Sequence, residues 1–175
     1  MFRRIRETVP AALVPLAWTF AIAAHLGAIG RRPVLIGHLV MDVLLVLFVV
    51  LSWTDMREGV LRAWRGVILA GIPVTLAGTL GLLVVTWPLS APLRAVSVVG
   101  WTLLPAPALL STGRESVGSA RTVNYAAAAL SVAGAAAYLA GLVGGAAPDA
   151  TVRLAGLALV GVGQTAGIVD AVVRY

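Results

Sequence analysis

The residues of this sequence best suited to chemistry are His25, His38 and Asp42, which lie within long apolar stretches. The two histidines are the only ones in the chain, and the short connection at residues 31–33 separates the stretches that carry them. So short a connection makes two helices neighbours, and both histidines lie near it, so we expect the imidazoles at matched depth. Asp42 follows His38 by four residues and therefore shares its helix face, one turn deeper.

These three residues are compatible with several kinds of site. The imidazoles could ligate a metal ion or the iron of haem b, and together with Asp42 they could relay protons. A charged aspartate inside a membrane costs about 2.5–3.5 kcal/mol on insertion scales, so Asp42 must face a partner or a polar interior, or carry a proton. The role could also be structural, with the histidines joining two helices and Asp42 hydrogen-bonded locally. The sequence leaves these alternatives open and predicts no other cofactor.

The composition places these residues in a membrane. Of the 175 residues, 60% are apolar and 11% are charged, whereas soluble domains are about 45–50% apolar and about 25% charged. The mean hydropathy is +0.99. All 13 basic residues are arginines scattered between apolar stretches, which argues against a nucleic-acid-binding protein with a clustered basic face. Because the chain has no cysteine, disulfides and thiolate metal sites are excluded.

Six apolar stretches, each long enough to cross a bilayer as a helix, are separated by charged residues, proline and glycine. Their length and their lack of strict alternation argue against membrane β-strands. The sequence therefore predicts a single all-α transmembrane domain over residues 1–175, a polytopic helical bundle with short loops and the lipid bilayer as its partner. The expected spans are residues 9–30, 34–53, 66–87, 93–112, 123–144 and 151–172.

The arginines also predict the orientation of this multi-pass protein. Nine arginines lie on the side of the termini and of the connections after the second and fourth spans, and four lie on the opposite side. Since arginine accumulates on the cytoplasmic side, both termini are expected in the cytoplasm of a prokaryotic cell, with the protein in its plasma membrane. The first stretch runs on to Gly30, so we interpret it as a span and not as a signal peptide.

Prolines and tryptophans inside the spans mark a candidate cavity. Pro73 lies in the third span, and Pro105 and Pro107 lie in the fourth, where each proline frees a backbone carbonyl and bends the helix. Trp18 and Trp101 lie in the middle of spans, so they are expected to point inward, either filling the core or facing a ligand. The residues predicted to line such a cavity are Trp18, Trp101, Pro105 and Gln164.

Small residues in the last two spans predict close helix packing. Ala133, Ala137 and Gly141 recur every four residues, and Gly163 and Gly167 form a GxxxG pair. This packing could join the last two spans within one chain. It could equally join two chains in a homo-oligomer or hold a partner protein in a membrane complex.

The sequence contains no nucleotide-binding loop, metalloprotease motif, nucleophile elbow or pair of catalytic carboxylates within a span. We therefore expect a small integral membrane protein that is not an enzyme and acts as an accessory or assembly subunit. A first alternative is a carrier of protons, ions or small molecules that uses Asp42 and the bent third and fourth spans. A second alternative is a haem-binding electron-transfer subunit that uses His25 and His38.

Overall fold

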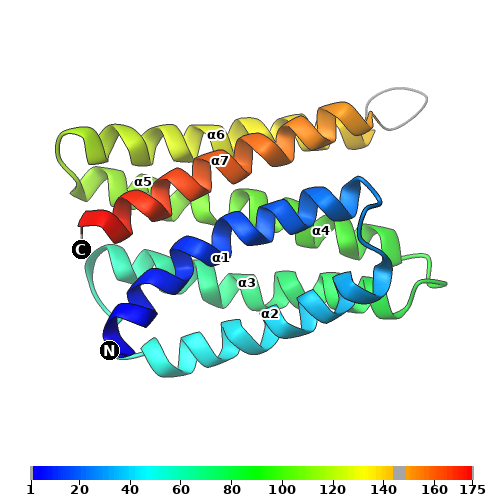
Figure 1. Cartoon of the computed structure of the whole chain (residues 1–175), viewed down its shortest axis with the longest axis horizontal. Helices are drawn as coiled ribbons and strands as arrows, with labels where there is room; N and C mark the ends of the chain where they lie inside the picture. Colours follow the sequence, from blue (N-terminus) through cyan, green and yellow to red (C-terminus); the bar gives the residue numbers. More distant parts are fainter. Residues whose placement is uncertain (1, 144–148, 175) are drawn as a thin grey trace.

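The computed structural model describes the backbone of residues 2–143 and 149–174, and the side chains of residues 12–143 and 149–173. Every regular element in these ranges is an α-helix. Both chain ends lie at one end of the bundle (Figure 1), which we call the terminal end. The other end, with the α1–α2, α3–α4 and α6–α7 connections, is the distal end. The helices are α1 (Phe2–His25), α2 (Arg31–Ser52), α3 (Gly59–Leu83), α4 (Ser90–Leu103), α5 (Pro105–Glu115), α6 (Ser119–Val143) and α7 (Ala150–Arg174).

Five helical segments of the described chain are long and apolar enough to cross a bilayer, namely α2, α3, α4 together with α5, α6 and α7. The first predicted span corresponds to α1, whose apolar part with described side chains, Ala12–His25, is shorter. The chain is therefore a membrane-spanning helical bundle, as the sequence predicts. Residue 144, the predicted end of the fifth span, lies outside the described residues.

Most helix boundaries differ by a few residues from the predicted spans, and two of the differences affect the packing. Helix α1 ends at His25 and not at residue 30, because Gly27 has a φ of 74°, a left-handed conformation that favours glycine. Helix α3 begins at Gly59 and not at residue 66, so Arg65 lies within the helix. The Arg65 guanidinium lies 4.8 Å from the centre of the Trp53 ring, a cation–π contact that joins the two helices at the terminal end.

The prolines of the third and fourth spans have different effects. Helix α3 continues through Pro73 without interruption. The fourth span is divided, because α4 ends at Leu103 and α5 begins at Pro105. A proline at position 105 cannot donate the hydrogen bond that the carbonyl of Trp101 would receive in a continuous helix. The break is therefore a property of the fourth span alone.

Helices α6 and α7 touch through their backbones. A Cβ atom on Gly134 would lie 2.5 Å from the backbone oxygen of Gly156, and a Cβ on Gly156 would lie 2.6 Å from the backbone oxygen of Gly134. Any side chain at either position would force the helices apart, so glycine at both positions permits the contact. This close packing joins two helices of one chain.

The predicted stripe of small residues lies only partly in this contact. Gly141 is buried against α7, and Gly163 and Gly167 are buried against α6 and α5. Ala137 is half-buried, but Ala133 is exposed. Ala133 therefore takes no part in the contact between α6 and α7, where the neighbouring Gly134 provides the contacting surface. Its role in joining two chains or a partner protein stays a prediction.

Glycines of α3 receive side chains of α4 in the same way. A Cβ atom on any of three α3 glycines would lie less than 3.0 Å from an α4 side chain, which real Cβ atoms do not tolerate. The α4 side chains therefore lie directly on the α3 backbone. From the terminal end to the distal end, the pairs are Gly71 with Trp101, Gly78 with Ser97, and Gly81 with Arg94.

Helices α1 and α2 have different neighbours, although a short turn joins them. Helix α1 packs mainly on α7, and α2 packs mainly on α3. Phe20 of α1 reaches Gly37 of α2 near the distal end. Of the residues in the apolar stretch of α2, only 6% are buried inside the protein, so this helix lies at the edge of the bundle. The expectation that α1 and α2 are close neighbours therefore holds only near their connection.

Candidate functional site

Asp42 lies near the middle of α2, with its carboxyl group directed toward α3. Its Oδ2 accepts a hydrogen bond of 2.7 Å from the Thr79 hydroxyl. The other oxygen, Oδ1, is shielded from solvent and receives a hydrogen bond from no described residue. A shielded carboxylate oxygen without a donor is unfavourable when it is charged. A proton bound to Oδ1 would remove that charge while the hydrogen bond to Oδ2 remains.

His38 lies one turn closer to the distal end on the same helix and faces α3 and α4. Its Nδ1 lies 3.0 Å from the backbone oxygen of Val34, and because a carbonyl only accepts, Nδ1 is the donor. In a neutral ring Nε2 is then an acceptor. The position of a Cβ on Gly78 is 2.7 Å from His38 Nε2 and 2.6 Å from Ser97 Oγ, so these two atoms are at most 5.3 Å apart, the sum of the two distances. One water molecule can bridge such a separation.

Trp101 lies on the other side of Asp42, toward the terminal end. Its indole Nε1 donates a hydrogen bond of 2.9 Å to the hydroxyl of Thr75, which donates in turn to the backbone oxygen of Gly71 at 2.9 Å. The indole ring covers Gly71, where a Cβ would lie 2.6 Å from the ring. On α2, the next residue of the Asp42 face in this direction is the buried Leu45. The polar region around Asp42 therefore ends at these residues.

Gln164 of α7 occupies the position between the two inward-facing tryptophans. Its Oε1 accepts a hydrogen bond of 3.0 Å from Trp18 Nε1, and its Nε2 donates one of 3.1 Å to the backbone oxygen of Trp101. That oxygen is the one that Pro105 leaves without its helical donor. The structure thus joins three of the four predicted cavity-lining residues, Trp18, Trp101 and Gln164, by hydrogen bonds, and the fourth, Pro105, is buried one turn along the chain from Trp101. Trp18 and Gln164 are each less than a tenth exposed.

His25 contacts the other half of the bundle. Its Nδ1 lies 2.8 Å from the backbone oxygen of Ala21, and its Nε2 lies 3.0 Å from the hydroxyl of Tyr138 on α6. Because Nδ1 must donate to the carbonyl, a neutral ring accepts the Tyr138 hydrogen at Nε2. The two rings meet edge to face, with centroids 5.6 Å apart. Both ring nitrogens of His25 are therefore engaged by the protein.

The structure gives His25 and His38 different partners. His25 contacts Tyr138 of α6, whereas His38 faces α3 and α4. Within the described ranges, no group of three or more histidine, aspartate or glutamate side chains is arranged to hold a metal ion. Asp42 and His38 remain associated as the sequence predicts, since they lie four residues apart on one face of α2.

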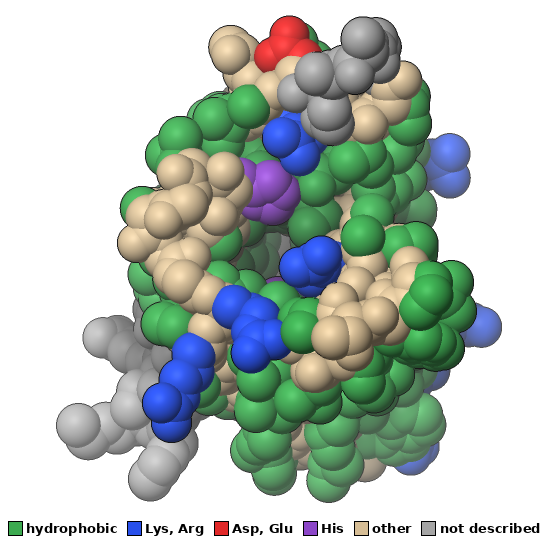
Figure 2. All heavy atoms as spheres, turned by 90° about the vertical axis from the view of Figure 1, so that its right-hand side faces the viewer, with side chains coloured by type: hydrophobic (Ala, Val, Ile, Leu, Met, Phe, Trp, Pro, Cys, Tyr) green, Lys and Arg blue, Asp and Glu red, His purple; other side chains and the backbone are tan. Residues whose placement is uncertain are grey.

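The distal end of the bundle is hollowed between the helices, and basic and histidine side chains lie beside the hollow (Figure 2). Gly81 of α3 and Arg94 of α4, the glycine contact nearest this end, lie about one turn beyond the level of Gly78 and Ser97. The hollow and the polar region around His38 are therefore at the same end of the molecule.

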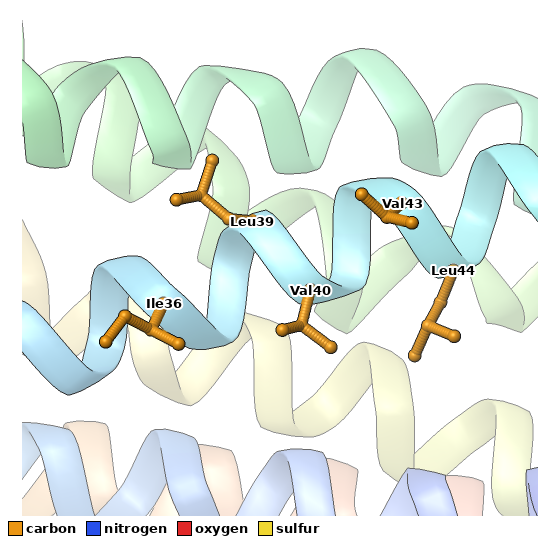
Figure 3. A pocket seen from close by; sticks show the side chains of 5 residues that line it. All are labelled: Ile36, Leu39, Val40, Val43 and Leu44. Atoms are coloured by element: carbon orange, nitrogen blue, oxygen red, sulfur yellow. The ribbon is translucent and has the colours of Figure 1, made fainter.

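Two shallow grooves on the outer surface are formed by α2 alone. One is lined by Asp42, Val43, Val46 and Leu47. Figure 3 shows the second, lined by Ile36, Leu39, Val40, Val43 and Leu44, with side chains that point to opposite sides of the helix. These spaces lie between side chains of an edge helix, where lipid chains can fill them. Asp42 lies beside this surface but directs Oδ2 away from it, to α3.

The sequence interpretation missed four hydroxyl groups of this region, those of Thr75, Thr79, Ser97 and Tyr138. Hydroxyls are common in membrane helices and commonly bond to their own helix, so their presence alone is uninformative. A signal does exist in the third span, where Gly71, Thr75 and Gly78 follow one another at intervals of four and three residues, and Thr79 follows Thr75 by four. That spacing puts one small or hydroxyl-bearing stripe on a single helix face.

No family model matches the chain, and neither a curated protein nor a solved structure shows significant similarity to it.

Proposed function

We propose that this protein is a proton carrier of the membrane in which Asp42 binds and releases the proton. The observation that supports this best is the asymmetric environment of its carboxyl group. The Thr79 hydroxyl donates a hydrogen bond of 2.7 Å to Asp42 Oδ2, while Oδ1 is buried and receives no hydrogen bond from the described residues. The hydroxyl orients the carboxyl group but brings no positive charge to neutralise it.

The energetics of this environment favour a group that exchanges a proton. An aspartate charge deep in a bilayer costs about 2.5–3.5 kcal/mol on insertion scales, and protonation removes that cost. His38, one turn away on the same face, is a side chain suited to passing a proton near neutral pH. Carriers commonly hold such groups near the middle of the membrane, beside a broken helix. On α3, Thr79, the partner of Asp42, lies one turn from Thr75, whose hydroxyl accepts a hydrogen bond from Trp101 of the fourth span.

The remaining expectations fit this proposal in part. We propose a protein without enzymatic activity in a prokaryotic plasma membrane, with both termini in the cytoplasm. An accessory or assembly subunit is the alternative, and in that case Asp42 only joins α2 to α3. The haem proposal has less support, because both ring nitrogens of His25 are hydrogen-bonded to Ala21 and Tyr138.

The test compares wild-type protein with Asp42→Asn in liposomes that enclose a pH-sensitive dye and carry an imposed pH gradient. Asparagine keeps an oxygen that can accept from Thr79 but cannot exchange a proton. We expect proton flux to fall to the level of protein-free liposomes while the variant still folds. Asp55→Asn, in the exposed α2–α3 connection, is the matched control and should keep the wild-type flux.

The opposite result would support the accessory subunit. If wild-type protein moves no protons, or if Asp42→Asn moves them as fast as wild type, the carrier proposal is wrong. A melting temperature measured on each purified variant separates loss of function from loss of the fold.

A further inference from the structure

We infer that Asp42 exchanges its proton with the distal side of the membrane along His38 and Ser97, and that Trp101 seals it from the terminal side. This inference rests on the proposed function and assigns the route and the gate of the same site.

The route follows from side chains that converge from three helices on Gly78. His38 comes from α2 and Ser97 from α4, and each lies within 2.7 Å of the place where a Cβ of Gly78 would be. Glycine at this position thus lets an imidazole nitrogen and a hydroxyl approach each other across α3. Both groups can accept and donate protons, and one water molecule can bridge them. Asp42 lies one turn closer to the terminal end than His38. It is hydrogen-bonded to Thr79, the residue that follows Gly78.

The distal hollow lies at the end of the molecule toward which this route runs. Figure 2 shows the hollow with histidine and basic side chains beside it. On α4, Arg94 lies one turn beyond Ser97 with its side chain against Gly81. The charged and titratable groups along α2, α3 and α4 in this half are Asp42, His38 and Arg94, with Arg31 and Arg32 in the first turn of α2. A cationic group at the mouth attracts anions, so proton-carrying buffer anions can reach the entrance.

The seal follows from the contacts on the terminal side of Asp42. The Trp101 ring lies directly on the backbone of Gly71, and its Nε1 is bonded to Thr75, which is only 2% exposed. About 10 Å of helix separates the level of Gly71 from that of Gly78. Gln164 holds the carbonyl of Trp101 just before the break at Leu104. Movement of α4 relative to α5 at this break would lift the indole from Gly71 and open the terminal side.

Cysteine accessibility tests the inference without measuring proton flux. The chain has no cysteine of its own, so Ser97→Cys introduces a single thiol. The reagent is a membrane-impermeant, anionic methanethiosulfonate, which suits a cationic entrance, added to either face of proteoliposomes whose orientation is checked with a cleavable C-terminal tag. Ser131→Cys is the matched control, because Ser131 is also a buried serine (0% exposed, against 4% for Ser97) but lies on α6, where it bonds to Ala127.

We expect Ser97→Cys to react from the distal face at least about tenfold faster than Ser131→Cys, because thiol reactivity follows access to water and ionisation. Reagent on the terminal face should leave it unmodified. Adding Trp101→Ala should make the same cysteine reactive from the terminal face as well. A thiol that is inert from the distal face, or equally reactive from both faces in the presence of Trp101, overturns the inference. Loss of flux in Asp42→Asn with an inert Ser97→Cys would leave the proton carrier standing and refute only this route.

Discussion

At the scale of single residues, the side-chain amide of Gln164 replaces a hydrogen bond that a neighbouring helix lacks. Pro105 deprives the Trp101 carbonyl of its helical donor, and Gln164 supplies a donor from α7 at 3.1 Å. The same side chain accepts from the Trp18 indole at 3.0 Å. Each of these polar groups would be unpaired in a medium without water if the amide were absent. Gln164 therefore joins α1, α4 and α7 at the level of the break.

Replacing Gln164 by methionine keeps the length of the side chain and removes both hydrogen bonds. We expect a loss of stability of about 1–2 kcal/mol, because hydrogen bonds of membrane proteins contribute about 0.6 kcal/mol each and the orphaned groups add a further cost. The melting temperature in detergent should fall by about 2–4 °C for each kcal/mol lost. Val162→Met, on the exposed side of the same helix, should leave it unchanged. Equal melting temperatures for the two variants would show that the amide has no such role.

The sequence predicts part of this residue-scale picture. Spacing alone places His38 and Asp42 on one face of a helix, and mid-span position directs Trp18 and Trp101 inward. It does not predict that Thr79 is the partner of Asp42, because that contact depends on how α2 is aligned against α3. Nor does it predict whether Trp18, Trp101, Pro105 and Gln164 surround an open cavity or bond to one another.

At the scale of helices, glycine contacts determine which faces meet. Gly134 and Gly156 bring the backbones of α6 and α7 together, and the α3 glycines accept side chains of α4. Hydropathy predicts the helices themselves, because a span must satisfy its backbone internally and expose apolar side chains to lipid. It does not predict the contacting faces, since lipid-facing and helix-facing surfaces are both apolar. Ala133 is an example, a small residue on the exposed face of α6.

Gly156→Ala tests the helix contact directly. The new methyl group would lie 2.6 Å from the backbone oxygen of Gly134 and 2.7 Å from the backbone nitrogen of Tyr138, neither of which can move independently. We expect destabilisation of about 1–3 kcal/mol from overpacking, measured as a lower melting temperature. Gly66→Ala, a helical position with open space around it, should instead be neutral or stabilising by up to about 1 kcal/mol. A stable Gly156→Ala variant would contradict the described contact.

At the scale of the whole molecule, the two ends of the bundle differ in shape and in chemistry. The distal end is hollowed, and the Asp42 region reaches toward it through His38, whereas Trp101 and Leu45 lie on the terminal side. The number of spans follows from hydropathy, because the thickness of the bilayer fixes their length. Hydropathy does not predict the hollow, because the hollow depends on α1 and α2 packing against different neighbours.

The orientation of the ends is a separate prediction. Reporter domains fused after Arg32 should be detected outside the cell, and domains fused after Glu58 or Ser119 should be detected in the cytoplasm. The reason is the excess of arginine on the terminal side, nine against four. An outside signal after Glu58 would reverse the orientation and place the distal hollow in the cytoplasm.

The central claim is that Asp42 itself gains and loses a proton, and infrared difference spectroscopy of the protein in lipid tests this most directly. On acidification, wild-type protein should gain a carboxylic-acid C=O band that is absent from Asp42→Asn. Thr79→Val should shift the frequency of that band, because the valine cannot donate the hydrogen bond that Oδ2 receives. The account would be contradicted by an identical acid-induced spectrum in wild type and Asp42→Asn, since Asp42 would then keep one protonation state throughout.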